Sequence, residues 1–248
     1  MKLRHLFYSL IGGFLLAASS SAATLQIDFS DNTGSYSGSQ SPGHAAGDVS
    51  GTTWNTAVGD VASGLLWDDG TAAAGLQVDV GGGPPTTTID WDLNLNESSD
   101  SATIPFYDTS LMRDWHYTSG NANLGARVNG LDAGIYRVYA LIRESNQLAR
   151  TYEAAIGVNV NAWSDAGVVE VTPITDASGA TTWTDGQNYA STDVTVSGPS
   201  DWVTVVVDPI NAQWGTLEGL QIVAIPEPSS AVLFGLAGLA LCGVRRRR

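Results

Sequence analysis

The chain has 248 residues, of which 15% are charged and 8% aromatic, and this composition is typical of one globular domain rather than a disordered or fibrous chain. Between Thr24 and Ile225 there are 5 basic residues against 24 acidic ones, a net charge of −19. A surface this acidic repels phosphate backbones, which argues against nucleic acid as a partner. The single cysteine, Cys242, excludes an intramolecular disulfide and a cysteine zinc site.

Residues 1–23 have the pattern of a secretory signal peptide. Lys2 and Arg4 precede an apolar stretch at 6–18, and small residues follow up to Ala23. We expect signal peptidase to cleave after Ala23. A permanent N-terminal membrane anchor is the alternative interpretation, but the apolar run is short for one.

Residues 24–225 are predicted to form an exported, acidic, all-β domain. Alternating apolar and polar residues predict strands at 77–80, 89–96, 135–143, 152–160, 193–196, 202–207 and 217–224. Runs rich in Gly, Ser, Thr and Pro predict long loops at 30–51, 81–88 and 176–188. Helical periodicity is nearly absent, so we expect an antiparallel β-sandwich.

Two segments resemble known sandwich features. The turn at 131–135 delivers Tyr136 to the start of a strand, which resembles the tyrosine corner of sandwich domains. Residues 218–225 are similar to the closing strand of galactose-binding-like and malectin-like jelly rolls. The second resemblance implies a jelly-roll-like closure and transfers no binding residue.

Eight tryptophans suggest that some aromatic rings stack against sugars. The best candidate for glycan contact is Trp115, since His116 and Tyr117 follow it and polar groups flank the ring. Packing in the core or anchoring of a loop is the alternative role for Trp115. Trp91 and Trp202 lie in predicted strands and are expected in the core.

Acidic residues in predicted turns allow a calcium interpretation, because carboxylates and backbone carbonyls are the ligands of a hard cation. The candidates are Asp28, Asp31, Asp68 and Asp69. Solvated turn acids are the alternative, and no run has the spacing of an EF-hand loop.

The sequence contains no Gly-x-Ser-x-Gly elbow and no His-Glu-x-x-His helix. Asp114 and His116 are two residues apart and would share a strand face, but a hydrogen-bonded pair accounts for them equally well. We therefore expect no catalytic activity.

The C-terminal segment 226–248 combines three features in a fixed order. A Pro-Glu-Pro triplet precedes an apolar segment at 231–244, whose 14 residues would span about 21 Å as a helix, short of the ~30 Å hydrocarbon core. A basic cluster ends the chain and would stay cytoplasmic. The residues of the triplet and the cluster are Pro226, Glu227, Pro228, Arg245, Arg246, Arg247 and Arg248.

This order of features resembles the PEP-CTERM sorting signal of exported bacterial proteins. The resemblance implies a transient membrane anchor that an exosortase, a membrane transpeptidase, recognises and removes. It also implies a place at the cell surface or in an exopolysaccharide or biofilm matrix. We therefore expect a non-catalytic structural or adhesive protein. A carbohydrate-binding module and a polysaccharide hydrolase are the two alternatives.

Overall fold

The computed structural model describes residues 23–29, 53–57, 61–84, 88–92, 96–99, 114–119, 122–142, 151–162, 164–175, 183–210 and 214–226. Within these ranges the chain forms fourteen strands and no helix. Apart from Ala23, the predicted signal peptide lies outside the described residues, and so do the apolar segment 231–244 and the arginine cluster.

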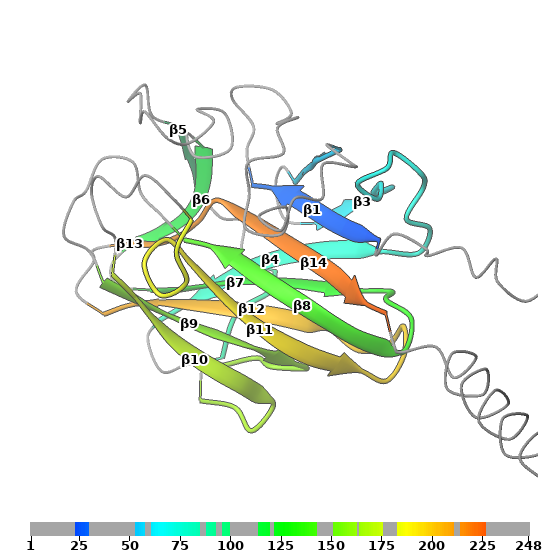
Figure 1. The fold of residues 1–248 in the computed structure, drawn as a ribbon. Coiled ribbons are helices and arrows are strands. Elements are labelled where there is room, and N and C mark those ends of the chain that lie inside the picture. Colours follow the sequence, from blue (N-terminus) through cyan, green and yellow to red (C-terminus); the bar gives the residue numbers. More distant parts are fainter. Residues whose placement is uncertain are drawn as a thin grey trace, which may run out of the picture.

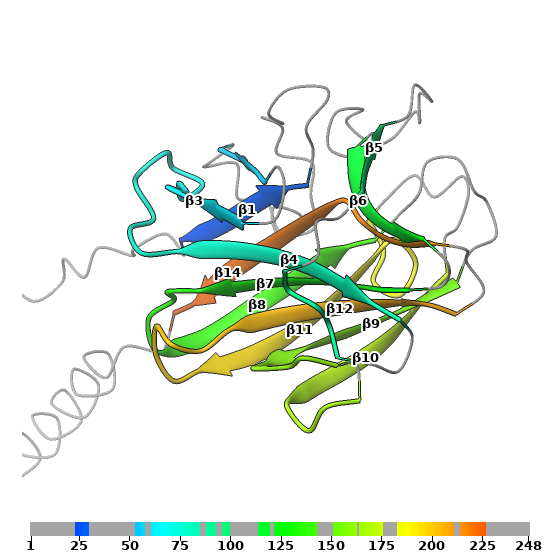
Figure 2. The same cartoon turned by 180° about the vertical axis from the view of Figure 1, so that it is seen from behind.

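Two large sheets lie face to face and a small third sheet stands at one end (Figures 1 and 2). The five-stranded sheet has the order β11 (Tyr189–Val196), β8 (Gly134–Leu141), β14 (Gly219–Ile225), β1 (Thr24–Asp28) and β2 (Asn55–Thr56). The six-stranded sheet has the order β10 (Val168–Thr175), β9 (Thr151–Val158), β12 (Val203–Pro209), β7 (Asn123–Asn129), β4 (Gln77–Gly83) and β3 (Val61–Ser63). The third sheet has the order β13 (Trp214–Leu217), β6 (Asp114–Ser119) and β5 (Asn96–Ser99). The predicted antiparallel sandwich is confirmed, and among the paired strands only β1 and β2 run parallel within the described ranges.

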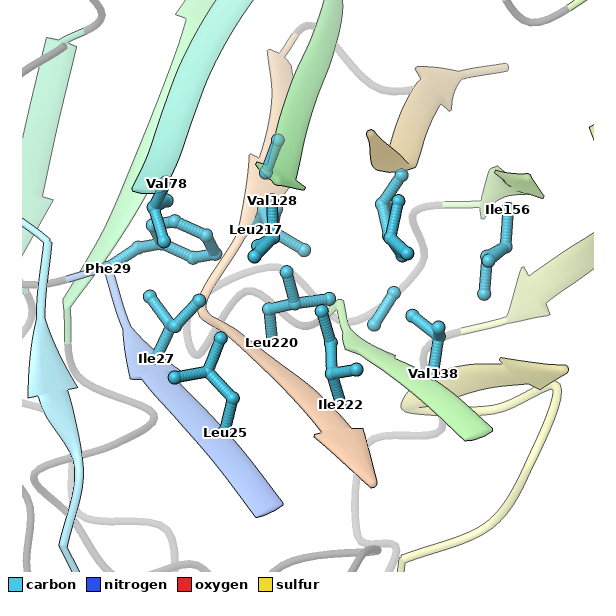
Figure 3. Packing of buried hydrophobic residues seen from close by; sticks show 14 of the residues in the cluster. Leu25, Ile27, Phe29, Val78, Val128, Val138, Ile156, Leu217, Leu220 and Ile222 are labelled. Carbon is cyan, nitrogen blue, oxygen red and sulfur yellow. The ribbon is translucent and has the colours of Figure 1, made fainter. Parts of the chain in front are cut away.

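The core fills the space between the two large sheets. Leu25 and Ile27 of β1 lie on the side of Val78 and Val128 of the other sheet, and Val138 of β8 lies opposite Ile156 (Figure 3). Each of these side chains is at most 1% exposed. Burial of one such aliphatic side chain contributes about 1.5–3 kcal/mol, so this layer supplies most of the driving force for folding.

Strand β8 has the two faces that the alternation predicts. Val138 and Ala140 are fully buried, whereas Ile135 and Arg137 are exposed on the other face. At the start of the strand, the Tyr136 hydroxyl donates a hydrogen bond of 3.0 Å to the carbonyl of Asp132. The predicted tyrosine corner is therefore confirmed, and it ties the turn at 131–135 to the first residues of β8.

The predicted strand 89–96 is wrong in its first half. Asp90 forms one isolated bridge with Gly82, and a turn follows at 91–92. The segment lies on the outer face of the six-stranded sheet, where Gly81 of β4 pairs with Gly125 of β7. A Cβ added at Gly81 would come within 2.4 Å of the Asp90 carbonyl oxygen. Two opposed glycines thus leave room for a second layer of chain.

The predicted loop at 81–88 is wrong at its start, where the same glycine-rich run belongs to a strand. Residues 81–83 were expected to begin the loop at 81–88, but they complete β4 and pair along β7. Their lack of side chains is a packing feature of the outer face rather than a signal for a turn.

Strand β1 is not among the predicted strands, although it lies inside its sheet, between β14 and β2. All five of its residues are buried. Strand β2 pairs with Ile27 and Asp28, and Trp67 forms a bridge with Leu25, so other segments of chain lie along β1 on the side away from β14. The Gln26 amide donates to the Thr53 carbonyl at 3.1 Å, and the Asn55 amide donates to the Gln26 carbonyl at 2.8 Å. A polar residue such as Gln26 is buried at no large cost because these hydrogen bonds satisfy it.

Candidate functional site

The predicted glycan-contact residues lie in β6 of the third sheet. The backbone pairs Trp115 with Ser98 of β5 and His116 with Leu217 of β13. The side chain of Tyr117 is half-buried, whereas the side chains of Trp115 and His116 lie outside the described residues. The glycan role of this segment therefore stays a prediction.

Three of the acidic residues proposed for calcium lie at two places in the fold, and the fourth lies outside the described residues. Asp28 is fully buried at the end of β1, and Asp31 lies outside the described residues. Asp68 is 7% exposed, and its carboxylate accepts a hydrogen bond of 3.3 Å from the backbone nitrogen of Thr24. Asp69 is exposed, and hydrogen bonds from Thr71 lower the pKa of its carboxyl group.

Across the described ranges, no three His, Cys, Asp or Glu residues gather in a way that could hold a metal ion. The side chains of Asp114 and His116, proposed as a pair, are outside those ranges. The calcium interpretation and the proposed pair both stay predictions.

An aromatic patch that the sequence did not predict lies on the outer face of the five-stranded sheet. It consists of Tyr139 on β8, Tyr189 on β11 and Trp183 just before β11, all half-buried. The ring centroids of Tyr139 and Tyr189 are 5.8 Å apart, and those of Trp183 and Tyr189 are 6.4 Å apart with an edge-to-face tilt. Three rings from separate segments thus form one surface.

Charged groups stand beside the aromatic patch. Arg137 makes a two-point ion pair with Asp193, with distances of 2.5 Å and 2.8 Å. The Ser191 hydroxyl donates to the Asp185 carboxylate at 2.6 Å. Burial raises the pKa of Tyr189, and the nearby Asp185 carboxylate raises it further, so its hydroxyl stays protonated. The patch therefore joins apolar ring faces to hydrogen-bond donors and acceptors, a combination suited to polyols and sugars.

The patch escaped prediction because Tyr139 lies more than forty positions before the other two rings. Trp183 lies in a predicted loop, and Tyr139 is an outward residue of a predicted strand. Pairing of β8 with β11 sets Ser191 opposite Tyr139 and so brings the rings together. The one local signal was an aromatic residue on the polar face of a strand.

A second aromatic group lies on the outer face of the six-stranded sheet. The Arg127 guanidinium carbon is 4.2 Å from the ring centroids of both Trp91 and Trp202. Arg127 also donates to Asp79 at 2.7 Å, and the Trp91 indole nitrogen donates to Asn161 at 3.1 Å. The prediction that both tryptophans lie in the core is wrong, because they are half-buried outside the sheet.

This arrangement holds the second layer of chain against the sheet. Trp91 packs beside a small cluster of buried residues, Ile89, Ala155, Val160 and Val206. Because Arg127 interacts with both rings and a carboxylate, we assign the group a stabilising role rather than a binding role.

No helix among the described residues is both long enough and apolar enough to cross a membrane. The last described strand, β14, ends at Ile225, directly before the Pro-Glu-Pro triplet. A β-sandwich followed at once by a triplet, an apolar run and a basic cluster defines a class of exported protein with a C-terminal sorting segment.

Residues 224–248 match the family described as the PEP-CTERM protein-sorting motif. The expected resemblance is thereby confirmed for this segment. The motif indicates an exported protein that is anchored transiently in the membrane by its C-terminus. The motif also implies processing by an exosortase. No curated protein matches the chain.

Several solved structures are similar to the chain at low identity. A family 35 carbohydrate binding module from Clostridium thermocellum has 14% identity and a TM-score of 0.34, over 68% of this chain and 100% of that one. A CBM35 from Cellvibrio japonicus has 13% identity and a TM-score of 0.33, over 60% and 94%. The ANXUR2 extracellular domain from Arabidopsis thaliana has 7% identity and a TM-score of 0.40, over 82% of this chain and 42% of that one.

Proposed function

We propose that this protein is a non-catalytic structural or adhesive component of a bacterial cell surface or exopolysaccharide matrix. The observation that carries the proposal is the sorting motif at 224–248, which overlaps the last two residues of β14. The sandwich is therefore joined to its sorting segment without a long linker. In this proposal signal peptidase removes residues 1–23, and an exosortase then cuts near Pro226.

The arrangement of β1 and β14 supports this route. Thr24 pairs with Val223, and the Ala224 backbone nitrogen donates to the Ala23 carbonyl at 3.0 Å. The start of β1 and the end of β14 thus lie side by side at one end of the sandwich (Figure 1). Because both connections leave from this end, the leader and the tail can lie in one membrane while the sandwich stays outside.

Mass spectrometry of the protein recovered from surface material tests the proposal. We expect a chain that begins at Thr24 and has lost the arginines at 245–248. A variant lacking residues 226–248 should be released to the medium instead of being retained. Intact terminal arginines in surface material, or unchanged sorting of the shortened variant, would contradict the proposal.

Carbohydrate binding is a second candidate function, and the aromatic patch of Tyr139, Tyr189 and Trp183 favours it. Pyranose rings present C–H groups that stack on aromatic faces, while their hydroxyl groups would bond with Arg137 and Asp193 at the rim. The net charge of −19 on residues 24–225 repels anionic polymers. We therefore propose a neutral polysaccharide as the ligand class.

A glycan array probed with the secreted protein tests this candidate. Loss of one stacking ring is worth about 1 kcal/mol or somewhat more, so Trp183→Ala and Tyr139→Ala should each weaken binding by about fivefold to tenfold. Ile135→Ala is a matched control, since Ile135 is 39% exposed on the same face of β8.

Three outcomes would count against this site. A protein that binds no glycan is not a carbohydrate-binding module. Loss of binding in Trp115→Ala, with Trp183→Ala unaffected, would move the site to β6. Release of free sugar from the glycan, abolished by replacing one carboxylate, would identify a hydrolase and contradict the non-catalytic proposal.

A further inference from the structure

The first residue of β1 is bound by an acidic side chain. Thr24 is 5% exposed and Asp68 is 7% exposed. The Thr24 backbone nitrogen donates to Asp68 Oδ1 at 3.3 Å, and the Asp68 backbone nitrogen donates back to the Thr24 carbonyl at 2.9 Å. A carboxylate is thus buried beside the peptide nitrogen at the expected cleavage site.

We propose that removal of the leader converts this hydrogen bond between a peptide N–H and a carboxylate into a buried ion pair between the new N-terminus and Asp68. Water hydrolyses the Ala23–Thr24 peptide bond, leaving a carboxylate on Ala23 and an ammonium group on Thr24. The ammonium nitrogen is the same atom that already lies 3.3 Å from Asp68 Oδ1. The inference rests on the proposed cleavage after Ala23.

The conversion favours the mature form. Asp68 is buried before and after cleavage, so the cost of removing its carboxylate from water is shared by both forms. Only the new ammonium group adds a desolvation cost, and its attraction to the adjacent carboxylate offsets that cost. The bond from the peptide N–H to the carboxylate has one ionised partner before cleavage, and the new ammonium group makes both partners ionised, which adds a direct charge–charge attraction. Cleavage removes the bond from Ala224 to the Ala23 carbonyl, but that bond joins two half-buried residues where β1 begins and β14 ends.

The position of the ion pair gives it a structural consequence. β1 lies between β14 and β2, and its side chains Leu25 and Ile27 are fully buried in the core. Fixing the first residue of β1 therefore prevents fraying of an interior strand. Removal of the signal peptide would in this way stabilise the end of the sandwich where β1 begins and where β14 leads into the sorting segment.

The composition of the chain makes this inference directly measurable. Lys2 is the only lysine, and it lies in the leader. After cleavage, the α-amino group of Thr24 is the only primary amine in the protein. An amine-reactive acylating reagent then reports on this one group, since arginine guanidinium groups stay protonated and unreactive.

The experiment uses the mature protein secreted from the full-length gene, with N-terminal sequencing to identify its first residue. We expect the sequence Thr-Leu-Gln and an acylation rate at least about tenfold slower in the native protein than in the chain unfolded in denaturant. Asp68→Asn should label markedly faster than the native protein. Asp69→Asn is the matched control and should label slowly, because Asp69 is exposed and bonds only with Thr71 among its described contacts.

Equal labelling rates in the native and unfolded wild-type protein would overturn the ion pair, whether or not Asp68→Asn folds. Equal rates in Asp68→Asn and Asp69→Asn, both folded, would also overturn it. A first residue other than Thr24 would instead refute the cleavage on which the inference rests. Loss of surface sorting with a protected amine would refute the proposed function alone.

Discussion

The stack of Arg127 between Trp91 and Trp202 allows a test of how much burial adds to an ion pair. We consider Arg127→Met, which keeps most of the apolar stem and removes the guanidinium group. Its control is Arg137→Met on the opposite sheet, where the arginine also pairs with an aspartate. The side chains of Arg127 and its partner are 20% and 8% exposed, against 44% and 42% for Arg137 and its partner.

The expected magnitudes follow from this difference. Each ring contact of Arg127 is worth about 1 kcal/mol, and its hydrogen bond to the largely buried Asp79 carboxylate about 1.5–3 kcal/mol. We therefore expect Arg127→Met to lower the free energy of unfolding by about 3–5 kcal/mol. The exposed pair of Arg137 and Asp193 contributes only about 0.2–1 kcal/mol, since solvent screens it.

Urea unfolding followed by tryptophan fluorescence measures both variants. With a slope of about 2 kcal/mol per molar urea, the midpoint should fall by about 1.5–2.5 M in Arg127→Met. In Arg137→Met it should fall by less than about 0.5 M. Equal shifts in the two variants would show that neither stacking nor burial strengthens the Arg127 pair, and would refute the reasoning.

Three further predictions use the same unfolding assay. Gly125→Ala places a Cβ 2.8 Å from the Trp91 ring and should cost about 1–3 kcal/mol, whereas Gly198→Ala, which meets nothing within 4 Å, should change stability by less than about 0.5 kcal/mol. Tyr136→Phe removes the corner hydrogen bond and should cost about 1 kcal/mol; no change would show that the corner adds no stability. The hydrogen bond from Arg137 lowers the pKa of Asp193 below its ordinary value of 3.8, so the ion pair stabilises the folded protein fully above that pH. As the pH falls through the lowered pKa, Asp193 is protonated and the free energies of unfolding of the wild type and Arg137→Met should converge.

The interpretation from sequence succeeded where a signal is local. Alternation along a single strand predicted both faces of β8, and the turn before Tyr136 predicted the tyrosine corner. The sorting segment was also recognisable, because its triplet, apolar run and basic cluster are contiguous. Such features depend on neighbouring residues and need no knowledge of the rest of the fold.

It failed where a distant segment changes the environment of a residue. Alternation at 89–96 is real, but Gly81 and Gly125 on two other strands provide a flat surface on which part of that segment packs as a second layer. Trp91 accordingly lies outside the sheet, beside an arginine of β7. Full burial of β1 similarly depends on the segments at 53–57 and 66–68, which lie against it.

By itself the sequence determined the all-β class, the acidic character of the exported domain and the sorting segment at its end, because periodicity, composition and contiguous motifs are properties of neighbouring residues. Only the tertiary structure decided which aromatic rings gather at the surface and which carboxylate lies beside Thr24. Strand pairing sets those neighbours, since it joins residues that are more than forty positions apart, as Thr24 and Asp68 are.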